Sequence, residues 1–250
     1  MGVAEMVISH EHKYLFVELP LTGSTAVREE LCAYYDGVPI LTKHSSYSTF
    51  VRNASSDEKE YFVFSCIRNP LDTVVSHYFK LRTNHWKFDS QKRINKRNIL
   101  NRVLYRFGHL RQFRFIQDNQ ADFPTFFLKF YTLPYDNWSS LDHQNFDVVI
   151  RFERLSGDFA KVIELIGLEQ QRSLPVKNKT SDKASNFWSY YDTPTVRKRA
   201  KSVFMPFMNK WGYNFPADWE PCKKSWLWEA EFESLKVFRN IYWRYLKHQV

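Results

Sequence analysis

The sequence predicts an α/β fold in which helices flank a central, mostly parallel sheet. Residues 13–19, 61–67 and 146–150 consist mainly of β-branched, aromatic and aliphatic types, as strands buried on both faces do. A segment with helical spacing of apolar residues follows each of them. A chain of 250 residues can form one large domain of this kind but is short for two. We therefore expect a single domain over residues 1–250.

The first strand, residues 13–19, leads into a loop of small and hydroxyl-bearing residues. This loop, residues 22–25 (TGST), should lie at the N-terminus of a helix over residues 24–35. Unpaired backbone N–H groups and the positive end of the helix dipole attract anions at such a place. The loop therefore indicates a phosphate or sulfate site. An ordinary turn, in which a Ser or Thr side chain caps the helix, would have the same sequence pattern.

The helix over residues 24–35 is predicted to bury one apolar stripe and to turn the charged residues 28–30 toward water. A short strand over residues 38–41 follows. It would bring Lys43 and His44 to the edge of the sheet at which parallel strands end, where open α/β sheets usually bind their ligands.

The second long strand, residues 61–67, ends at Arg68 and is followed by a helix that begins near Pro70. Arg68 thus stands beside a helix N-terminus, a position that suits bidentate recognition of a phosphate. A structural ion pair between Arg68 and Asp72 is the alternative. Apolar residues with helical spacing predict a buried stripe, and Ser76 is expected on its flank.

The rest of the chain is predicted to add a third long, buried strand and three helices. The strand, residues 146–150, precedes an amphipathic helix over residues 156–166, and a long helix over residues 194–211 comes later. We expect residues 216–250 to form a C-terminal helical extension. Its apolar stripe could pack on the domain or on a second copy of the chain, which makes it a candidate interface for a homo-oligomer.

The formal charge of +9 is concentrated in one segment. Residues 80–114 hold eleven Lys and Arg but a single acidic residue, Asp89. A local basic segment creates a field at one site and therefore indicates an anionic partner. Nucleic acid, an anionic polysaccharide and a membrane surface would all fit this charge.

The three cysteines have no spacing typical of a metal site, and their odd number favours buried thiols in a reducing compartment. They are Cys32, Cys66 and Cys222. The N-terminus lacks the pattern of a signal peptide, and no stretch approaches the ~18 apolar residues of a membrane span. We expect a cytoplasmic protein without a membrane span and without a metal.

Three separated motifs resemble those of the sulfotransferases that use 3′-phosphoadenosine 5′-phosphosulfate (PAPS). PLTGST at residues 20–25 is similar to the family's loop for the 5′-phosphosulfate, and CIRNPLDTVVSHY at residues 66–78 is similar to its 3′-phosphate motif. FERL, LPVKNKT and WGYNF follow in the family's order. The resemblance covers about residues 13–215 and is closest to the branch that contains carbohydrate sulfotransferases. It implies a P-loop-like nucleotide-binding fold, PAPS as sulfuryl donor and adenosine 3′,5′-bisphosphate (PAP) as product.

The resemblance also implies which residues bind the nucleotide. The 5′-phosphosulfate would be held by Thr22, Gly23, Ser24, Thr25 and Ala26. The 3′-phosphate would be held by Arg68 and Ser76. Further contacts from the third motif would come from Lys177, Asn178 and Lys179.

The same resemblance makes His44 the candidate base that removes the proton of the acceptor hydroxyl. Glu18, just before the loop, is a second candidate base, unless its strand position places it in a structural pair. The family usually has a Lys after the Pro of the loop, where it stabilises the leaving group, but this chain has Leu21. We expect Lys43 to replace that cation, with Lys13 as the less favoured substitute.

The acceptor implied by the resemblance is a hydroxyl, and the basic segment favours one on an anionic carbohydrate over a small alcohol or phenol. Trp86, Tyr105 and Trp138 are candidate rings for stacking on sugars. We expect no nucleic-acid partner.

Three alternative functions share parts of this pattern. A P-loop kinase has the same strand–loop–helix arrangement, but the loop here lacks the GxxxxGK[ST] pattern. A domain that binds the nucleotide but transfers little, because of Leu21, is the second alternative. The third is a module that binds polyanions through residues 80–114, with steeply salt-dependent affinity.

Overall fold

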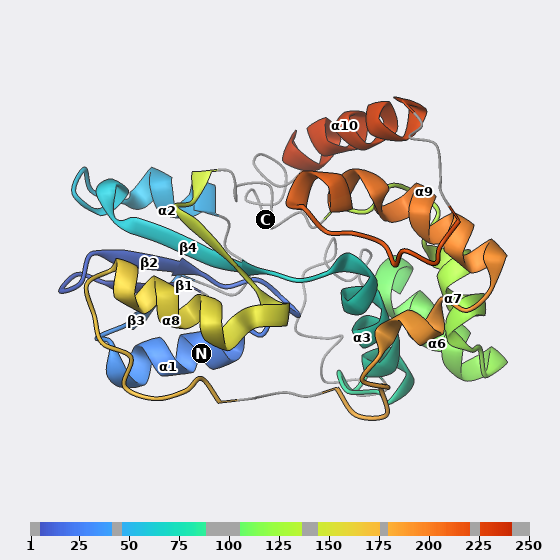
Figure 1. Cartoon of the computed structure of the whole chain (residues 1–250), viewed down its shortest axis with the longest axis horizontal. Coiled ribbons are helices and arrows are strands. Elements are labelled where there is room, and N and C mark those ends of the chain that lie inside the picture. Colours follow the sequence, from blue (N-terminus) through green and yellow to red (C-terminus); the bar gives the residue numbers. More distant parts are fainter. Residues whose placement is uncertain are drawn as a thin grey trace. The chain divides into compact units, whose positions relative to one another are not determined.

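The computed structural model describes residues 6–41, 47–88, 106–136, 145–175, 180–220 and 226–241, with residues 106 and 107 described by their backbone alone. The chain divides into two compact units (Figure 1). The sheet unit comprises residues 1–69, 136–179 and 233–250, and the helical unit comprises residues 70–135 and 180–232. The expectation of one domain over residues 1–250 stays a prediction.

The sheet unit is built on five strands in the order β3-β1-β2-β4-β5. Their bounds are β1 (Met6–Ser9), β2 (Tyr14–Val17), β3 (Val38–Ile40), β4 (Phe62–Ile67) and β5 (Val148–Arg151). β2 and β4 are parallel, as are β4 and β5, whereas β1 is antiparallel to both of its neighbours. Among the described strands, β1 alone therefore runs against the other four. The predicted α/β fold with a mostly parallel sheet is confirmed.

Strand β1 was not among the strands that the sequence predicts. It has only four residues and forms a hairpin with β2, with Met6 opposite Val17 and Ser9 opposite Tyr14. Four residues are too few for periodicity to separate a strand from any short apolar run. Its pairing with β2 and β3 is decided by the sheet, because each neighbour offers β1 a ladder of backbone partners.

The two faces of the sheet are covered by different helices. These helices are α1 (Ser24–Tyr34), α8 (Leu155–Leu165) and α2 (Tyr47–Asn53). Side chains of α1 and α8 pack in one core with Phe16 and Phe64, and Phe50 of α2 packs in a second core with Leu15 and Val63. Figure 1 shows α1 and α8 together on one side of the strands. Because side chains alternate along each strand, consecutive residues of β2 and β4 supply the two cores in turn.

The prediction that residues 28–30 face water is wrong for Glu30. The Glu30 side chain is buried, with 1% of the residue exposed. Arg172 binds it in a bidentate manner, with Nε 3.0 Å from Oε1 and Nη2 2.9 Å from Oε2. Helical spacing reports only which residues share a face, so it could not reveal a partner that follows α8 in the chain.

In the described part of the helical unit, four helices pack around an aromatic core. Their bounds are α3 (Pro70–Arg82), α6 (Arg111–Asn119), α7 (Phe123–Phe130) and α9 (Pro194–Trp211). The largest fully buried side chains of this core include Tyr78, Phe126, Phe127, Tyr191 and Phe204. The predicted helix over residues 194–211 is confirmed, whereas α7 was not predicted.

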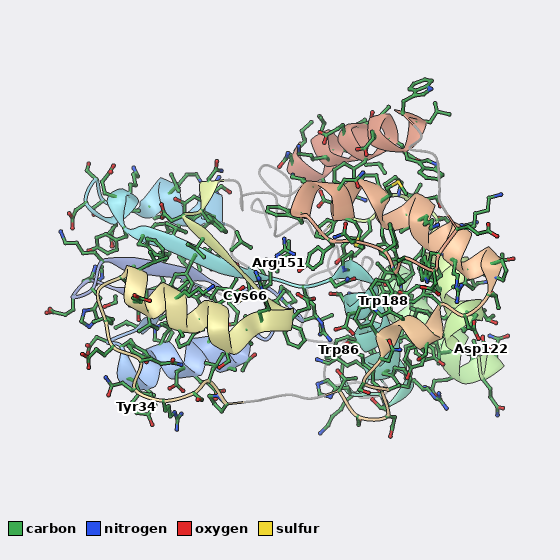
Figure 2. All side chains as sticks on the ribbon, in the orientation of Figure 1. Tyr34, Cys66, Trp86, Asp122, Arg151 and Trp188 are labelled. Atoms are coloured by element: carbon green, nitrogen blue, oxygen red, sulfur yellow. The ribbon has the colours of Figure 1, made fainter. Side chains whose placement is uncertain are left out.

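Both α7 and α9 begin with a side-chain cap. The Asp122 carboxylate, at the start of α7, accepts a hydrogen bond of 2.9 Å from Thr125 N (Figure 2). Thr193 Oγ1 accepts one of 3.3 Å from Val196 N, and Gly212, with φ of 64°, follows the end of α9. Shorter helical turns complete the described chain: η1 (Glu58–Glu60), η2 (Arg106–Leu110), η4 (Phe152–Arg154) and η5 (Phe187–Tyr190).

The predicted C-terminal helical extension contains helix α10 (Trp226–Ile241). Two of its large apolar residues are mostly exposed, Trp226 with 75% and Phe238 with 70% of the residue accessible. Its role as an interface between copies of the chain stays a prediction. Among the described residues, no helix is both long and apolar enough to cross a membrane.

Two of the three cysteines lie in the described sheet unit. Cys66 of β4 is buried (Figure 2), and burial raises the pKa of its thiol strongly. Cys32 of α1 is exposed, so the expectation of buried thiols is wrong for this residue. The helix was expected to bury a single stripe, and residue 32 lies beside it rather than on it. Cys222 lies outside the described residues.

A buried histidine in α3 should make the helical unit sensitive to acid. His77 Nε2 lies 3.2 Å from His109 Nδ1, and its Nδ1 lies 3.3 Å from the Tyr131 hydroxyl. Burial, with smaller contributions from His109 and Lys80, lowers the pKa of His77 to about 3. The unfolded chain takes up this proton near pH ~6.5, so between pH ~6.5 and about 3 the unfolded state holds more protons.

We therefore expect the free energy of unfolding to fall as the pH falls through this window, by up to ~1.4 kcal/mol per pH unit. Urea unfolding of the wild type and of His77→Gln at several pH values measures the effect. The variant should show a flatter dependence, whereas His10→Gln, which changes an exposed histidine of the sheet unit, should match the wild type. Equal slopes for the wild type and His77→Gln would contradict the assignment.

Candidate active site

The loop that follows β2 is closed by its own hydroxyl groups. Thr22 Oγ1 donates a hydrogen bond of 2.9 Å to the Leu19 carbonyl, and Ser24 Oγ donates one of 2.6 Å to the same oxygen. Both side chains are buried. The two hydroxyls therefore hold the loop in shape, a role that the sequence did not distinguish from direct contact with an anion.

The backbone of this loop offers unpaired donors. Gly23 is the N-cap of α1, and no side chain caps the helix, so the alternative of an ordinary Ser/Thr cap is wrong. Within the described chain, the N–H groups of residues 22–25 donate to no protein acceptor, and the next one, Ala26 N, donates to the Gly23 carbonyl over 3.0 Å. Four consecutive free N–H groups at the start of an 11-residue helix suit an anion.

Gly23 is required by both backbone conformation and packing. Its φ is +79°, and a Cβ at this position would stand 2.7 Å from Leu155 Cδ2 and 2.9 Å from Phe152 Cδ2. Side chains other than glycine rarely adopt this φ, and neither distance leaves room for a methyl group. The loop backbone therefore packs directly against residues of η4 and α8.

Glu18 links the loop to α1. Its Oε1 accepts hydrogen bonds of 3.3 Å from Ser24 Oγ and 3.4 Å from Thr25 Oγ1, and its Oε2 lies 3.3 Å from Arg28 Nε. The side chain is mostly buried. These contacts favour the structural pair over the second candidate base, because the carboxylate is already held by a cation and two hydroxyls.

Arg68 contacts the same loop from the end of β4. One guanidinium N–H donates a hydrogen bond of 2.9 Å to the Leu21 carbonyl, and the guanidinium carbon lies 4.1 Å from the centre of the Phe152 ring. The neighbouring Asn69 N donates one of 2.7 Å to Glu153 Oε1. Leu21 has a φ of +65°, so Arg68 holds a loop residue in a conformation that side chains seldom adopt.

The loop after β2, residues 68 and 69 of the second motif and the FERL segment of the third therefore meet in the sheet unit. Phe152 touches both the space beside Gly23 and the guanidinium of Arg68, and Glu153 binds the backbone of Asn69. From the sequence we placed FERL in the third motif but predicted no role for Phe152 or Glu153. Phe152 packs against the loop and Arg68, and Glu153 holds the backbone that follows β4. These contacts join residues far apart in the chain, so the sequence could not reveal them.

In the helical unit, Ser76 lies on α3 and is completely buried, because α3 is buried on its flanks as well as along its apolar stripe. Lys183 Nζ lies 3.2 Å from Ser76 Oγ and forms an ion pair with Asp72 Oδ1. From the sequence we considered an ion pair between Arg68 and Asp72, and we did not single out Lys183 as a partner of Asp72. Nothing in the polar segment around residues 180–186 distinguishes this lysine from its neighbours before the fold is known.

Five predicted site residues lie outside the described part of the chain. They are Lys43, His44, Lys177, Asn178 and Lys179. Their roles stay predictions.

Comparison with known families supports the reading of these motifs. The sequence profile of the sulfotransferase family matches residues 4–205, which include the loop, Arg68, Ser76 and Lys183. The branch that contains carbohydrate sulfotransferases is consistent with this match. Searches of the curated proteins and of the solved structures gave no match. Because the match covers most of the sequence and the α/β fold agrees with it, the chain belongs to the sulfotransferase family.

Proposed function

We propose that the protein transfers the sulfuryl group of PAPS to a hydroxyl of a carbohydrate. The family match supports sulfuryl transfer in general. The observation that carries the choice of donor is the set of unpaired N–H groups of residues 22–25, held next to Arg68 by contacts with Leu21 and Phe152. Such donors fit the charged oxygens of a phosphosulfate.

We assign the nucleotide contacts as follows. Residues 22–26 bind the 5′-phosphosulfate, chiefly through their backbone, because the hydroxyls of Thr22 and Ser24 are occupied within the loop. Arg68 and Ser76 bind the 3′-phosphate. Residues 177–179 add contacts from the third motif.

The bound PAPS would supply the sulfuryl group for an in-line displacement by the acceptor hydroxyl. Negative charge then builds up on the phosphate oxygens of the leaving group, and the fixed N–H groups of the loop stabilise it without having to reorient. His44 acts as the base that accepts the proton of the acceptor hydroxyl. Lys43 provides the cation that this family usually places where the chain has Leu21.

A carbohydrate acceptor is supported by the family branch and by the charge of residues 80–114, which would attract an anionic sugar. Of the three candidate stacking rings, Trp86 packs within the helical unit, with ring centroids 5.5 Å from His77 and 5.8 Å from Phe88 (Figure 2). This packing favours a structural role for Trp86. Tyr105 and Trp138 lie outside the described residues.

Two measurements test the proposal. PAP without metal should raise the melting temperature of the protein, whereas ATP with Mg²⁺ should not, because the loop lacks the lysine of a P-loop. Incubation with labelled PAPS and a panel of polysaccharides, small alcohols and phenols should label a polysaccharide. Stabilisation by ATP with Mg²⁺ alone would instead indicate a kinase, and binding of PAP without transfer to any acceptor would contradict the proposed activity.

Lys43→Ala tests the replacement of the missing loop lysine. We expect kcat to fall by at least ~10²-fold, the usual cost of removing one donor from a charged leaving group, with little change in the affinity for PAP. The rate of sulfuryl transfer at saturating PAPS measures it.

The matched control is Lys59→Ala, which removes an exposed lysine of η1 and should leave kcat within twofold of the wild type. Adding Leu21→Lys to Lys43→Ala should restore part of the rate, because it returns the cation to its usual place in the family. Unchanged activity of Lys43→Ala would show that another residue supplies this charge.

A further inference from the structure

One lysine of the helical unit lies beside the serine that we assign to the 3′-phosphate. Lys183 Nζ is 3.2 Å from Ser76 Oγ and is paired with Asp72. Only 12% of the Lys183 side chain and 7% of the Asp72 side chain are exposed. Asp72 and Ser76 are four residues apart on α3, so they share one face of the helix, and Lys183 reaches that face from a distant segment.

The ion pair by itself does not explain this arrangement. Taking two charges out of water offsets most of their attraction, so a buried pair adds little net stability. Asp72 would satisfy the charge of Lys183 without Ser76. The additional contact places an ammonium group next to a hydroxyl that, in the proposed function, binds a phosphate.

We infer that Lys183 is the cation that makes the Ser76 site selective for a nucleotide with a 3′-phosphate, and that Asp72 positions it. This inference rests on the proposed function and extends it to a residue that no motif assigns. A phosphate monoester carries close to two negative charges, whereas a 3′-hydroxyl carries none. The ammonium group of Lys183 therefore attracts a nucleotide with a 3′-phosphate but not one with a 3′-hydroxyl. Burial strengthens this attraction, because less water screens the two charges.

The test must separate the loss of a phosphate contact from the loss of the buried ion pair between Lys183 and Asp72. Lys183→Met alone breaks a buried ion pair from one side, a change that strongly destabilises proteins and would obscure an effect on binding. The comparison is therefore made in the Asp72→Asn background, where residue 72 still has an oxygen acceptor but no charge. Isothermal titration measures the dissociation constants of PAP and of adenosine 5′-monophosphate for each variant.

We expect the wild type and Asp72→Asn to prefer PAP. The double variant Asp72→Asn/Lys183→Met should bind PAP about 10- to 100-fold more weakly than Asp72→Asn, the range expected for one charged hydrogen bond, and should bind the monophosphate equally well. As a matched control, Lys198→Met in the same background removes an exposed lysine of α9 and should change neither constant.

The outcomes separate this inference from the proposed function. If the double variant keeps the preference of Asp72→Asn for PAP, the role of Lys183 is wrong and the proposed function stands. If the wild type shows no preference for PAP over the monophosphate, the 3′-phosphate site itself is wrong, and with it the proposed donor.

Discussion

Gly23→Ala is expected to destabilise the sheet unit by about 3 kcal/mol and to lower the rate of sulfuryl transfer by at least ~10²-fold. The left-handed φ costs ~1–2 kcal/mol and overpacking ~1–3 kcal/mol. The new methyl group would lie 2.7 Å from Leu155 Cδ2 and 2.9 Å from Phe152 Cδ2, on a residue whose φ is +79°. Relief of these contacts moves the loop that holds the unpaired N–H groups. A displacement of about 1 Å at such a site can cost ~10²-fold in rate by itself.

Alanine substitutions at two other glycines separate the cost of the left-handed φ from the cost of overpacking. Gly157, within α8, has open space around its Cβ position and no positive φ, so Gly157→Ala should be neutral or stabilising by up to ~1 kcal/mol. Gly167 has a φ of +78° but also open space, so Gly167→Ala should cost only the backbone strain, about 1–2 kcal/mol.

Urea unfolding and titration with PAP should be carried out on all three variants. Only Gly23→Ala should lose PAP binding. A Gly23→Ala protein that binds PAP normally and is no less stable than Gly167→Ala would show that the close approach of the loop to Phe152 is unimportant.

Arg68→Met is expected to lower kcat/KM for PAPS by about 10²- to 10³-fold. The change removes a proposed ligand of the 3′-phosphate, worth ~1.5–3 kcal/mol as a charged hydrogen bond, and it removes the donor to the Leu21 carbonyl, worth ~1 kcal/mol. Arg68→Lys keeps the charge but loses the fork of donors and the planar contact with Phe152, so it should recover only part of the activity.

Steady-state kinetics with varied PAPS measures both Arg68 variants. Arg154→Met is the matched control, because Arg154 lies in the same unit with its side chain 67% exposed, and its ion pair with Asp158 on the surface contributes little. Its kcat/KM should stay within twofold of the wild type. If Arg68→Met keeps more than a third of the activity, Arg68 serves the loop or the core but does not bind the nucleotide.

Most secondary structure near the site could be predicted from the sequence. The strands β2 and β4 and the helices α1, α3, α8 and α9 follow from composition and periodicity, because burial of one face selects which residues recur along each element. The short elements β1, α2 and α7 could not be predicted in this way. They are too brief for a period to be recognised, and their pairing or packing is supplied by the rest of the fold.

For the candidate site, too, some features could be predicted from the sequence and others required the folded structure. The sequence by itself determined that a strand leads into a TGST loop and a helix, and that Arg68 follows the end of another strand. It also determined that the two motifs are those of sulfotransferases. All these features depend on residues that are neighbours in the chain. The sequence could not decide whether the hydroxyls or the N–H groups of the loop are available, since that depends on which acceptors the folded chain offers.

Only the tertiary structure decided which side chains contact the residues of the site and the buried charges. Phe152 beside Gly23 and Arg68, Arg172 on the buried Glu30, and Lys183 on Asp72 and Ser76 all join residues that are far apart in the chain. Local propensity and periodicity act over a few residues, whereas the partner of a buried charge is selected by the folded backbone that brings distant segments together. The chain's own pattern thus predicts where an anion can bind, and the packing of remote segments selects the side chains that surround it.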